Sequence, residues 1–289
     1  MTVLDETFTL SNGVKIPKLG FGTWLIDNDK VVEPVKVALD AGYRHIDTAQ
    51  AYGNEKGVGS ALRESSVLRE DIFVTTKLAA EIKSYDEAVA AIDQSLADLG
   101  LDYVDMMIIH APQPWADFRN GEHYFEGNLA AWQALEEAYD AGKIKAIGVS
   151  NFEQVDLDNI LQNGRIKPAV NQILAHVSNT PFDLIKYCQD NDVLVEAYSP
   201  VAHGEILHNP ELQKMADNYG VSVAQLCLQY CLQLGMLPLP KAETPSHIIS
   251  NTELAFTISD NDMVTLKQVD HIDNYGESDS FPVYDKTDK

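Results

Sequence analysis

The stretch IFVTTKLAAEIKSYDEAVAAIDQSLADLGLDYVDMMIIH, residues 72–110, contains one complete repeat of the fold. Two short apolar runs, residues 72–77 and 104–110, have the length of buried β-strands. Between them, residues 85–99 have the length and the apolar spacing of an amphipathic helix. Because parallel neighbours need a crossover connection, this order of strand, helix and strand indicates a parallel sheet.

The same alternation continues on both sides of this stretch. We predict further strands at residues 19–23, 44–47, 144–150, 169–172, 194–198 and 236–239. Helical patterns follow the strands, for example at residues 31–40, 58–65, around 129–141 and at 246–255. Eight strand-then-helix units predict an α/β fold, a (β/α)8 TIM barrel, rather than an open doubly wound sheet.

The two ends of the chain carry additional elements. Residues 7–10 and 14–16 flank Asn12-Gly13, a dipeptide that favours a tight hairpin turn, so an N-terminal β-hairpin is expected. The tail after Asp270 is rich in Asp, Ser, Tyr and Gly and is expected to be a short ordered loop. No Pro, Gly or Ser-rich linker interrupts the units, so we predict a single domain over residues 1–289.

Composition excludes several classes of partner. The 21 Lys and Arg residues against 44 Asp and Glu give a net charge of −23, which repels nucleic acid and anionic membranes. The start of the chain does not resemble a secretory signal, and no apolar run is long enough to cross a bilayer. Three cysteines are too few for a disulfide scaffold and are expected to be buried. These features predict a cytoplasmic protein that acts on a small molecule. No exposed apolar helix stands out as an interface, so a monomer is expected.

In a barrel, functional residues collect at the carboxyl ends of the strands. Polar residues at these ends are Asp47, Lys77, His110, Ser150, Gln172 and Tyr198. Tyr52 follows Asp47 by five residues, so a short loop can return its phenol over the barrel mouth. We expect Lys77 to lower the pKa of the Tyr52 phenol and Asp47 to hold Lys77 in place. His110 can then either donate a hydrogen bond to a substrate oxygen or exchange a proton with Tyr52. The set as a whole delivers a proton to an oxygen without an activated nucleophile.

Other chemistries fit the sequence less well. His45 and Asp47 form an H-x-D pair of the kind found in barrel metal sites, but no second histidine pair ends a later strand, so no metal is expected. The glycine-rich runs at residues 19–22 and 53–59 match neither the Rossmann nor the P-loop spacing. A G-x-S-x-G elbow for a serine hydrolase is also missing from the sequence.

Taken in order, the motifs resemble the signatures of the aldo-keto reductase family, and most closely its bacterial 2,5-diketo-D-gluconate reductase-like branch. They are GFGTW (20–24), RHIDTAQAYGNE (44–55), TTK (75–77), IIHAPQP (108–114), IGVSNF (147–152), NQI (171–173), AYSP (197–200) and LPK (239–241). The resemblance covers nearly the whole chain. It implies reduction of aldehydes or ketones with NADPH, on a small, sugar-derived or dicarbonyl substrate. The alternative is a non-catalytic nucleotide-binding protein on the same scaffold.

The resemblance also implies residue roles. Tyr52 would be the general acid, tuned by Lys77 and Asp47, and His110 would orient the carbonyl. The residues matching positions that hold the nicotinamide are Ser150, Asn151, Gln172 and Tyr198. Those matching positions along the pyrophosphate, the 2′-phosphate and the adenine are Ser199, Lys241, His247 and Asn251.

Two departures from the family pattern affect these expectations. Ala242 and His247 replace the usual serine and arginine after Lys241, which weakens the grip on a 2′-phosphate, so NADH is an alternative cofactor. Ala111 stands where a tryptophan commonly follows the catalytic histidine. Trp24 and Trp115 are then left, with Tyr52, His110 and Ala111, to form the substrate pocket.

Overall fold

The computed structural model describes residues 2–284, in which a short 3-10 turn, Val3–Asp5, precedes the expected β-hairpin. Strands β1 (Thr7–Thr9) and β2 (Lys15–Pro17) pair antiparallel. Gly13 takes a φ of +86° in the turn, a conformation that glycine adopts without strain. The side-chain oxygen of Asn12 accepts a hydrogen bond from the backbone N–H of Val14 at 3.2 Å, which fixes the turn.

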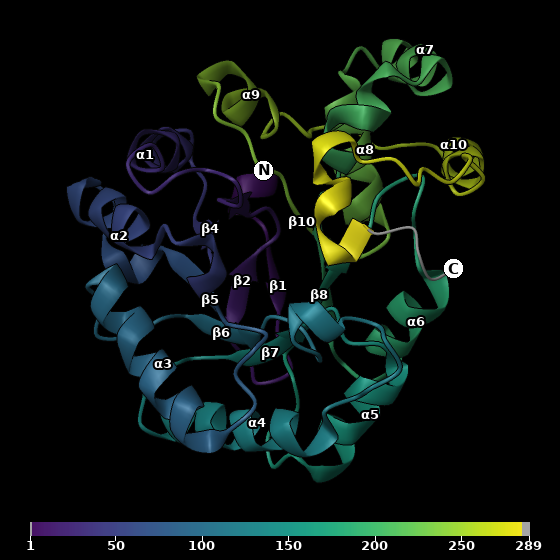
Figure 1. Cartoon of the computed structure of the whole chain (residues 1–289). Coiled ribbons are helices and arrows are strands. Elements are labelled where there is room, and N and C mark those ends of the chain that lie inside the picture. The colour runs from purple at the N-terminus through teal and green to yellow at the C-terminus, as the bar shows by residue number, and fades with distance from the viewer. Residues whose placement is uncertain (1, 285–289) are drawn as a thin grey trace.

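Eight parallel strands follow and form the predicted barrel (Figure 1). They are β3 (Phe21–Gly22), β4 (His45–Asp47), β5 (Phe73–Leu78), β6 (Met106–Ile109), β7 (Ile147–Ser150), β8 (Val170–Leu174), β9 (Leu194–Tyr198) and β10 (Leu237–Leu239). Each strand pairs with its neighbours in sequence. Backbone hydrogen bonds from Gly20 to Pro238 (3.2 Å) and from Gly22 to Pro240 (3.0 Å) join the first strand to the last and close the barrel.

Helices surround the strands (Figure 1). They are α1 (Val32–Asp40), α2 (Glu55–Glu64), α3 (Tyr85–Leu99), α4 (Phe125–Asp140), α5 (Gln154–Asn163), α6 (Phe182–Asp190), α7 (Pro210–Tyr219), α8 (Val223–Gln233), α9 (Pro245–Ser250) and α10 (Asp260–Leu266). The helix expected over residues 246–255 ends early, at Ser250, whose carbonyl accepts a hydrogen bond from the Gln225 side chain. The (β/α)8 prediction is confirmed, with differences at element ends.

The barrel interior is apolar at one end and polar at the other. Leu10 and Ile16 of the hairpin plug the amino-terminal end of the barrel. They belong to one buried apolar cluster with residues in the strands or directly before them: Phe73, Met106, Ile108, Ala146, Ala169, Val170, Leu237 and Leu239. This plug keeps water out below the site and leaves the carboxyl ends of the strands as the open mouth.

The tail packs over the barrel mouth. Tyr275 and Tyr284 are nearly fully buried, and the segment between them forms two short 3-10 turns, Gly276–Ser280 and Pro282–Tyr284. The prediction of an ordered tail is therefore confirmed as far as residue 284. Met1 and residues 285–289 lie outside the described residues, so the single domain over residues 1–289 stays a prediction.

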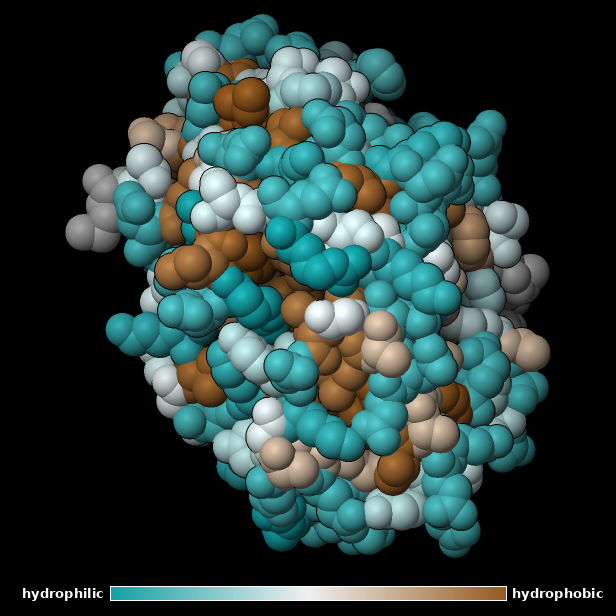
Figure 2. All heavy atoms as spheres, turned by 90° about the vertical axis from the view of Figure 1, so that its left-hand side faces the viewer, coloured by the Kyte–Doolittle hydropathy of each residue, from teal (hydrophilic) through white to brown (hydrophobic). Residues whose placement is uncertain are grey.

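The surface agrees with the acidic composition. The face that carries α1, α2 and α3 is mostly hydrophilic, with apolar side chains in smaller patches (Figure 2). As expected, Cys188, Cys227 and Cys231 are free and buried. Among residues 2–284, no helix combines the length and the apolar composition needed to span a membrane.

Candidate active site

The structure brings the four predicted catalytic residues together at the barrel mouth. The ammonium of Lys77, on β5, donates to Asp47 Oδ1 at 2.5 Å and to the phenol oxygen of Tyr52 at 3.2 Å. A third hydrogen bond goes to the carbonyl oxygen of Thr48 at 3.0 Å. Three oxygen acceptors match the three protons of an ammonium, so a fully buried lysine is satisfied here.

The environment of Tyr52 differs from the sequence-based expectation. Burial, and secondarily the negative charge of Asp47, raise the pKa of Tyr52 well above its ordinary value of 10. The expected lowering by Lys77 is therefore wrong for the free protein, because Asp47 offsets the lysine charge and the phenol is removed from water. Tyr52 keeps its proton at neutral pH, as a proton donor must.

His110 follows β6 and faces Tyr52. Their rings lie edge to face with centroids 5.6 Å apart. Burial, and then the charge of Lys77, lower the pKa of His110 well below its ordinary value of 6.5, so the ring is neutral. Its Nδ1 atom is buried without a hydrogen-bond partner among residues 2–284. We assign the proton to Nε2, because an unpaired lone pair at Nδ1 costs less than an unpaired N–H, and Nε2–H is then available to a substrate oxygen.

This protonation state predicts that kcat/KM changes little with pH below neutrality. Since the pKa of His110 lies well below 6.5, the imidazole is already neutral at pH 6 and does not titrate as the pH rises to 7.5. We expect kcat/KM for carbonyl reduction to change less than about twofold between pH 6 and 7.5. A steep change with an apparent pKa near 6.5 would contradict the neutral assignment.

A second buried carboxyl group adjoins the four predicted catalytic residues, and the sequence patterns did not identify it. Gln172 on β8 donates from Nε2 to Asp47 Oδ2 at 2.9 Å and to Glu196 Oε2 at 2.8 Å. Glu196 on β9 is fully buried. The sequence does show Glu196 as an acidic residue inside the apolar run LVEAY, residues 194–198. It was not selected because only polar residues at strand ends were considered as candidates.

The residues expected near the nicotinamide form one hydrogen-bonded group. Asn151 Nδ2 donates to the carbonyl oxygen of His110 at 2.9 Å, and the phenol of Tyr198 donates to Asn151 Oδ1 at 2.7 Å. Ser150 Oγ donates to the carbonyl oxygen of Gln172 at 2.8 Å. Because the amide nitrogen of Gln172 is already used, only its amide oxygen is left to accept from a carboxamide. These contacts leave the half-buried Tyr198 ring fixed at the mouth.

The other expected cofactor residues lie farther around the rim. Ser199 Oγ is 2.8 Å from the phenol of Tyr284 and 3.1 Å from His203 Nε2. Lys241, just after β10, is paired with Glu243, with 2.6 Å between Nζ and Oε1. His247 lies on α9, and Asn251 is the residue that follows this helix.

On the substrate side, Trp115 lies against His110, with ring centroids 5.2 Å apart. Ala111 is fully buried, so it does not face open space, and its carbonyl oxygen accepts from Lys83 at 3.0 Å. Trp24 lies against the tail, with its ring 4.8 Å from that of Phe281. Among the expected substrate residues, Trp24 and Trp115 thus supply aromatic surfaces, whereas Ala111 is buried.

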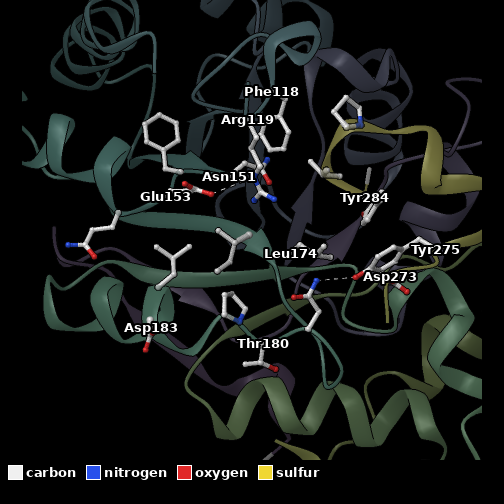
Figure 3. Close-up of a pocket in the computed structure, with 18 of the residues that line it drawn as sticks. Phe118, Arg119, Asn151, Glu153, Leu174, Thr180, Asp183, Asp273, Tyr275 and Tyr284 are labelled. Atoms are coloured by element: carbon white, nitrogen blue, oxygen red, sulfur yellow. Dashed lines mark hydrogen bonds and ion pairs between the residues drawn. The ribbon is translucent and has the colours of Figure 1, made fainter. Parts of the chain in front are cut away.

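A cavity of about 1250 Å³ adjoins this group. Trp115 and Asn151, which both contact His110, line it together with Arg119, Glu153 and Tyr284. Figure 3 shows Arg119 turned toward Glu153 beside Asn151, with Tyr284 on another wall. The nearest nitrogen and oxygen of Arg119 and Glu153 are 3.7 Å apart. The cavity therefore opens directly beside His110 and Asn151.

Comparison with known proteins is consistent with this geometry. Residues 18–271 match the model of the Aldo/keto reductase family. The barrel and this family match define an NAD(P)H-dependent oxidoreductase that reduces carbonyl groups. The chain belongs to the aldo/keto reductase family. The narrower 2,5-diketo-D-gluconate reductase-like branch stays a prediction.

Three relatives illustrate the similarity. The chain is 40% identical over 264 residues to the glyoxal reductase of Bacillus subtilis, covering 91% of this chain and 92% of the relative. The crystal structure of an aldo/keto reductase from Brucella melitensis has a TM-score of 0.87 at 37% identity, with 93% of this chain and 99% of that chain covered. The Bombyx mori aldo-keto reductase, solved in complex with NADP, has a TM-score of 0.85 at 32% identity, with 96% and 98% covered.

Proposed function

We propose that this chain reduces aldehydes and ketones to alcohols with NADPH, and that Tyr52 is the general acid. The supporting observation is the Tyr52 phenol, which is protonated, lies 3.2 Å from the Lys77 ammonium and faces the neutral ring of His110. A donor, its charge partner and a second hydrogen-bond donor therefore surround one point at the mouth. A carbonyl oxygen at that point is polarised and protonated by the same group.

The residues at the rim fit a nicotinamide nucleotide. Tyr198 offers a half-buried aromatic face held by Asn151, and Gln172 has a free amide oxygen beside it. When bound, the cofactor supplies the hydride. Ser150, Asn151 and Gln172 would hold the carboxamide, Tyr198 would stack on the ring, and Ser199 would lie along the pyrophosphate.

The proton step follows from relative acidities. Tyr52 is a weak acid with a pKa above 10, but the oxygen that becomes negative belongs to an alkoxide whose conjugate acid is a still weaker acid, comparable to water. Transfer from Tyr52 to that oxygen is therefore favourable once hydride has arrived. The phenolate left behind lies beside the Lys77 ammonium, and His110 Nε2–H holds the substrate oxygen in place.

The substrate is proposed to be a small dicarbonyl or sugar-derived compound. The glyoxal reductase of B. subtilis, named for a small dicarbonyl, supports this choice. The test is cofactor oxidation at 340 nm with a panel of glyoxal-like dicarbonyls, aldoses and aromatic aldehydes, using NADPH and NADH. We expect turnover of dicarbonyls with NADPH. Cofactor binding without turnover of any member of the panel would instead support the non-catalytic alternative.

The cofactor choice is set by a short ion pair. Lys241, the residue proposed to meet the 2′-phosphate together with His247, is paired with Glu243 at 2.6 Å. Glu243 repels a phosphate and its carboxylate can accept from a ribose hydroxyl, so NADH use is proposed beside NADPH. Asn251 is proposed to lie near the adenine.

We predict that Glu243→Gln shifts this preference toward NADPH. The change removes the repulsive charge and frees Lys241, so the ratio of NADH to NADPH dissociation constants should rise about three- to tenfold, as measured by fluorescence titration. Glu70→Gln, an exposed change elsewhere, serves as the control and should leave the ratio unchanged. An unchanged ratio in Glu243→Gln would contradict the proposed position of the 2′-phosphate.

We also propose that the protein acts as a monomer in the cytoplasm. Its strongly acidic composition and its free, buried cysteines support this proposal. Size-exclusion chromatography with light scattering tests the oligomeric state, and a dimer mass would overturn it.

A further inference from the structure

Glu196 occupies the middle of β9 and has no part in the mechanism above. Its side chain is fully buried, and its Oε1 atom has no hydrogen-bond partner among residues 2–284. Burying an ionised carboxylate without partners for both oxygens is costly, because the charge loses its hydration. A neutral carboxyl group tolerates this position better.

The contacts of Glu196 lead directly to the catalytic group. The amide nitrogen of Gln172 carries two hydrogens and gives one to Glu196 Oε2 (2.8 Å) and one to Asp47 Oδ2 (2.9 Å). The other oxygen of Asp47 accepts from Lys77, which also reaches Tyr52. An unbroken line of hydrogen bonds thus joins Glu196 to the proposed proton donor.

The charges around Glu196 favour its protonated form. Of the strands that surround it, β4 contributes Asp47 and the buried His45, β5 contributes Lys77, and β8 contributes the uncharged Gln172. The neighbouring β10 contributes apolar Leu237 and Leu239. Burial lowers the pKa of His45 to about 3, so it stays neutral. The single cation of this group, Lys77, is therefore shared by two carboxyl groups, those of Asp47 and Glu196.

The titration of Glu196 agrees with this arrangement. Burial, and then the negative charge of Asp47, raise the pKa of Glu196 from its ordinary value of 4.5 to about 8. The hydrogen bond from Gln172 and the charge of Lys77 act in the opposite direction without overcoming burial. The carboxyl group of Glu196 is therefore mainly protonated at pH 7.

We propose that Glu196 is a positioning residue of the reductase centre: its protonated carboxyl group holds the Gln172 amide against Asp47, and loss of that proton adds a buried negative charge that slows reduction. The added charge raises the pKa of Tyr52 further and opposes the negative charge that develops on the carbonyl oxygen. The kinetic part of this inference rests on the proposed function.

The first test compares pH profiles of carbonyl reduction. In the parent protein we expect kcat to fall about three- to tenfold between pH 7 and 9.5, with an apparent pKa near 8. Glu196→Gln has the shape of the protonated acid, still accepts from Gln172 and does not titrate. The kcat of this variant should therefore stay level between pH 7 and 9.5.

A matched control is Glu136→Gln. Glu136 is a buried acid on α4 whose Oε1 accepts from the backbone N–H groups of Arg165 and Ile166, outside the barrel mouth. Its variant should keep the alkaline fall of the parent. If Glu196→Gln also keeps the full fall, the proposal is wrong while the reductase function stands.

The second test does not depend on activity. Because the folded-state pKa of Glu196 is raised, the folded chain holds a proton between about pH 4.5 and 8 that the unfolded chain releases. The parent therefore loses stability relative to Glu196→Gln as the pH rises through this window. The difference in melting temperature in favour of the variant should grow by several degrees from pH 5 to pH 9. A constant difference would overturn the protonated assignment even if the chain reduced no carbonyl at all.

Discussion

Tyr52→Phe is expected to lower kcat for carbonyl reduction by about 10²–10⁴-fold, the contribution usual for a positioned general acid. The variant keeps the aromatic ring that lies edge to face with His110 at 5.6 Å and loses the phenol hydrogen beside Lys77. Hydride transfer in this variant must therefore produce an alkoxide, because the substrate oxygen no longer has the Tyr52 proton donor. Steady-state rates with NADPH and a dicarbonyl measure the effect.

Tyr43→Phe is the matched control for this prediction. Tyr43 is a fully buried tyrosine whose phenol donates to the carbonyl oxygen of Ile248 at 3.3 Å. Its loss should cost about 1 kcal/mol of stability and leave kcat unchanged. Dissociation constants for NADPH should be the same in Tyr52→Phe and the parent. A Tyr52→Phe protein that turns over within threefold of the parent would show that the proton comes from elsewhere.

Lys77→Met should damage both stability and activity. The change leaves Asp47 nearly buried with a negative charge and without its 2.5 Å partner, and removal of one member of such a pair costs about 3–5 kcal/mol. The phenolate of Tyr52 also loses its counter-charge, so kcat should fall at least ~100-fold. Urea unfolding followed by circular dichroism, together with the reductase assay, measures the two effects.

Two further variants separate these effects. Asp47→Asn combined with Lys77→Met removes the whole pair, so it should regain most of the lost stability and stay inactive. Lys145→Met breaks a pair with Asp105 in which the lysine is partly exposed, and it should cost less than about 1 kcal/mol and leave activity intact. If Lys77→Met behaved like Lys145→Met, the buried pair would have no special role.

The fold was predictable because its signal repeats. Each strand has a short apolar run, and the next helix follows after a polar turn, so errors at single ends do not change the architecture. The helix α3 agrees with the prediction at both ends, and its carboxyl end was readable because Gly100 takes a left-handed φ of +65° and stops the helix. In contrast, the end of α9 depends on Gln225, a side chain from another helix that no local pattern reveals.

The members of the candidate site that lie at the ends of strands could be predicted from the sequence. Asp47, Lys77 and His110 lie close to these ends, and Tyr52 is tied to them by a short loop. Glu196 was missed because it lies in the middle of β9 and its role depends on contact with Gln172 of the neighbouring strand β8. The direction of the Tyr52 pKa was also missed, since it depends on how far burial outweighs one lysine, and this balance exists only in the folded barrel.

The most direct test of the proposed carbonyl reduction is to follow the transferred hydride. NADPH carrying deuterium at the transferable position of C4 is incubated with the protein and a dicarbonyl, and the product is analysed by mass spectrometry. We predict one alcohol formed for each NADPH oxidised, with one deuterium on the new carbinol carbon, and formation of this product slowed by about 10²–10⁴-fold in Tyr52→Phe. Cofactor oxidation without a deuterated alcohol, or no reaction with any carbonyl, would contradict the proposed function.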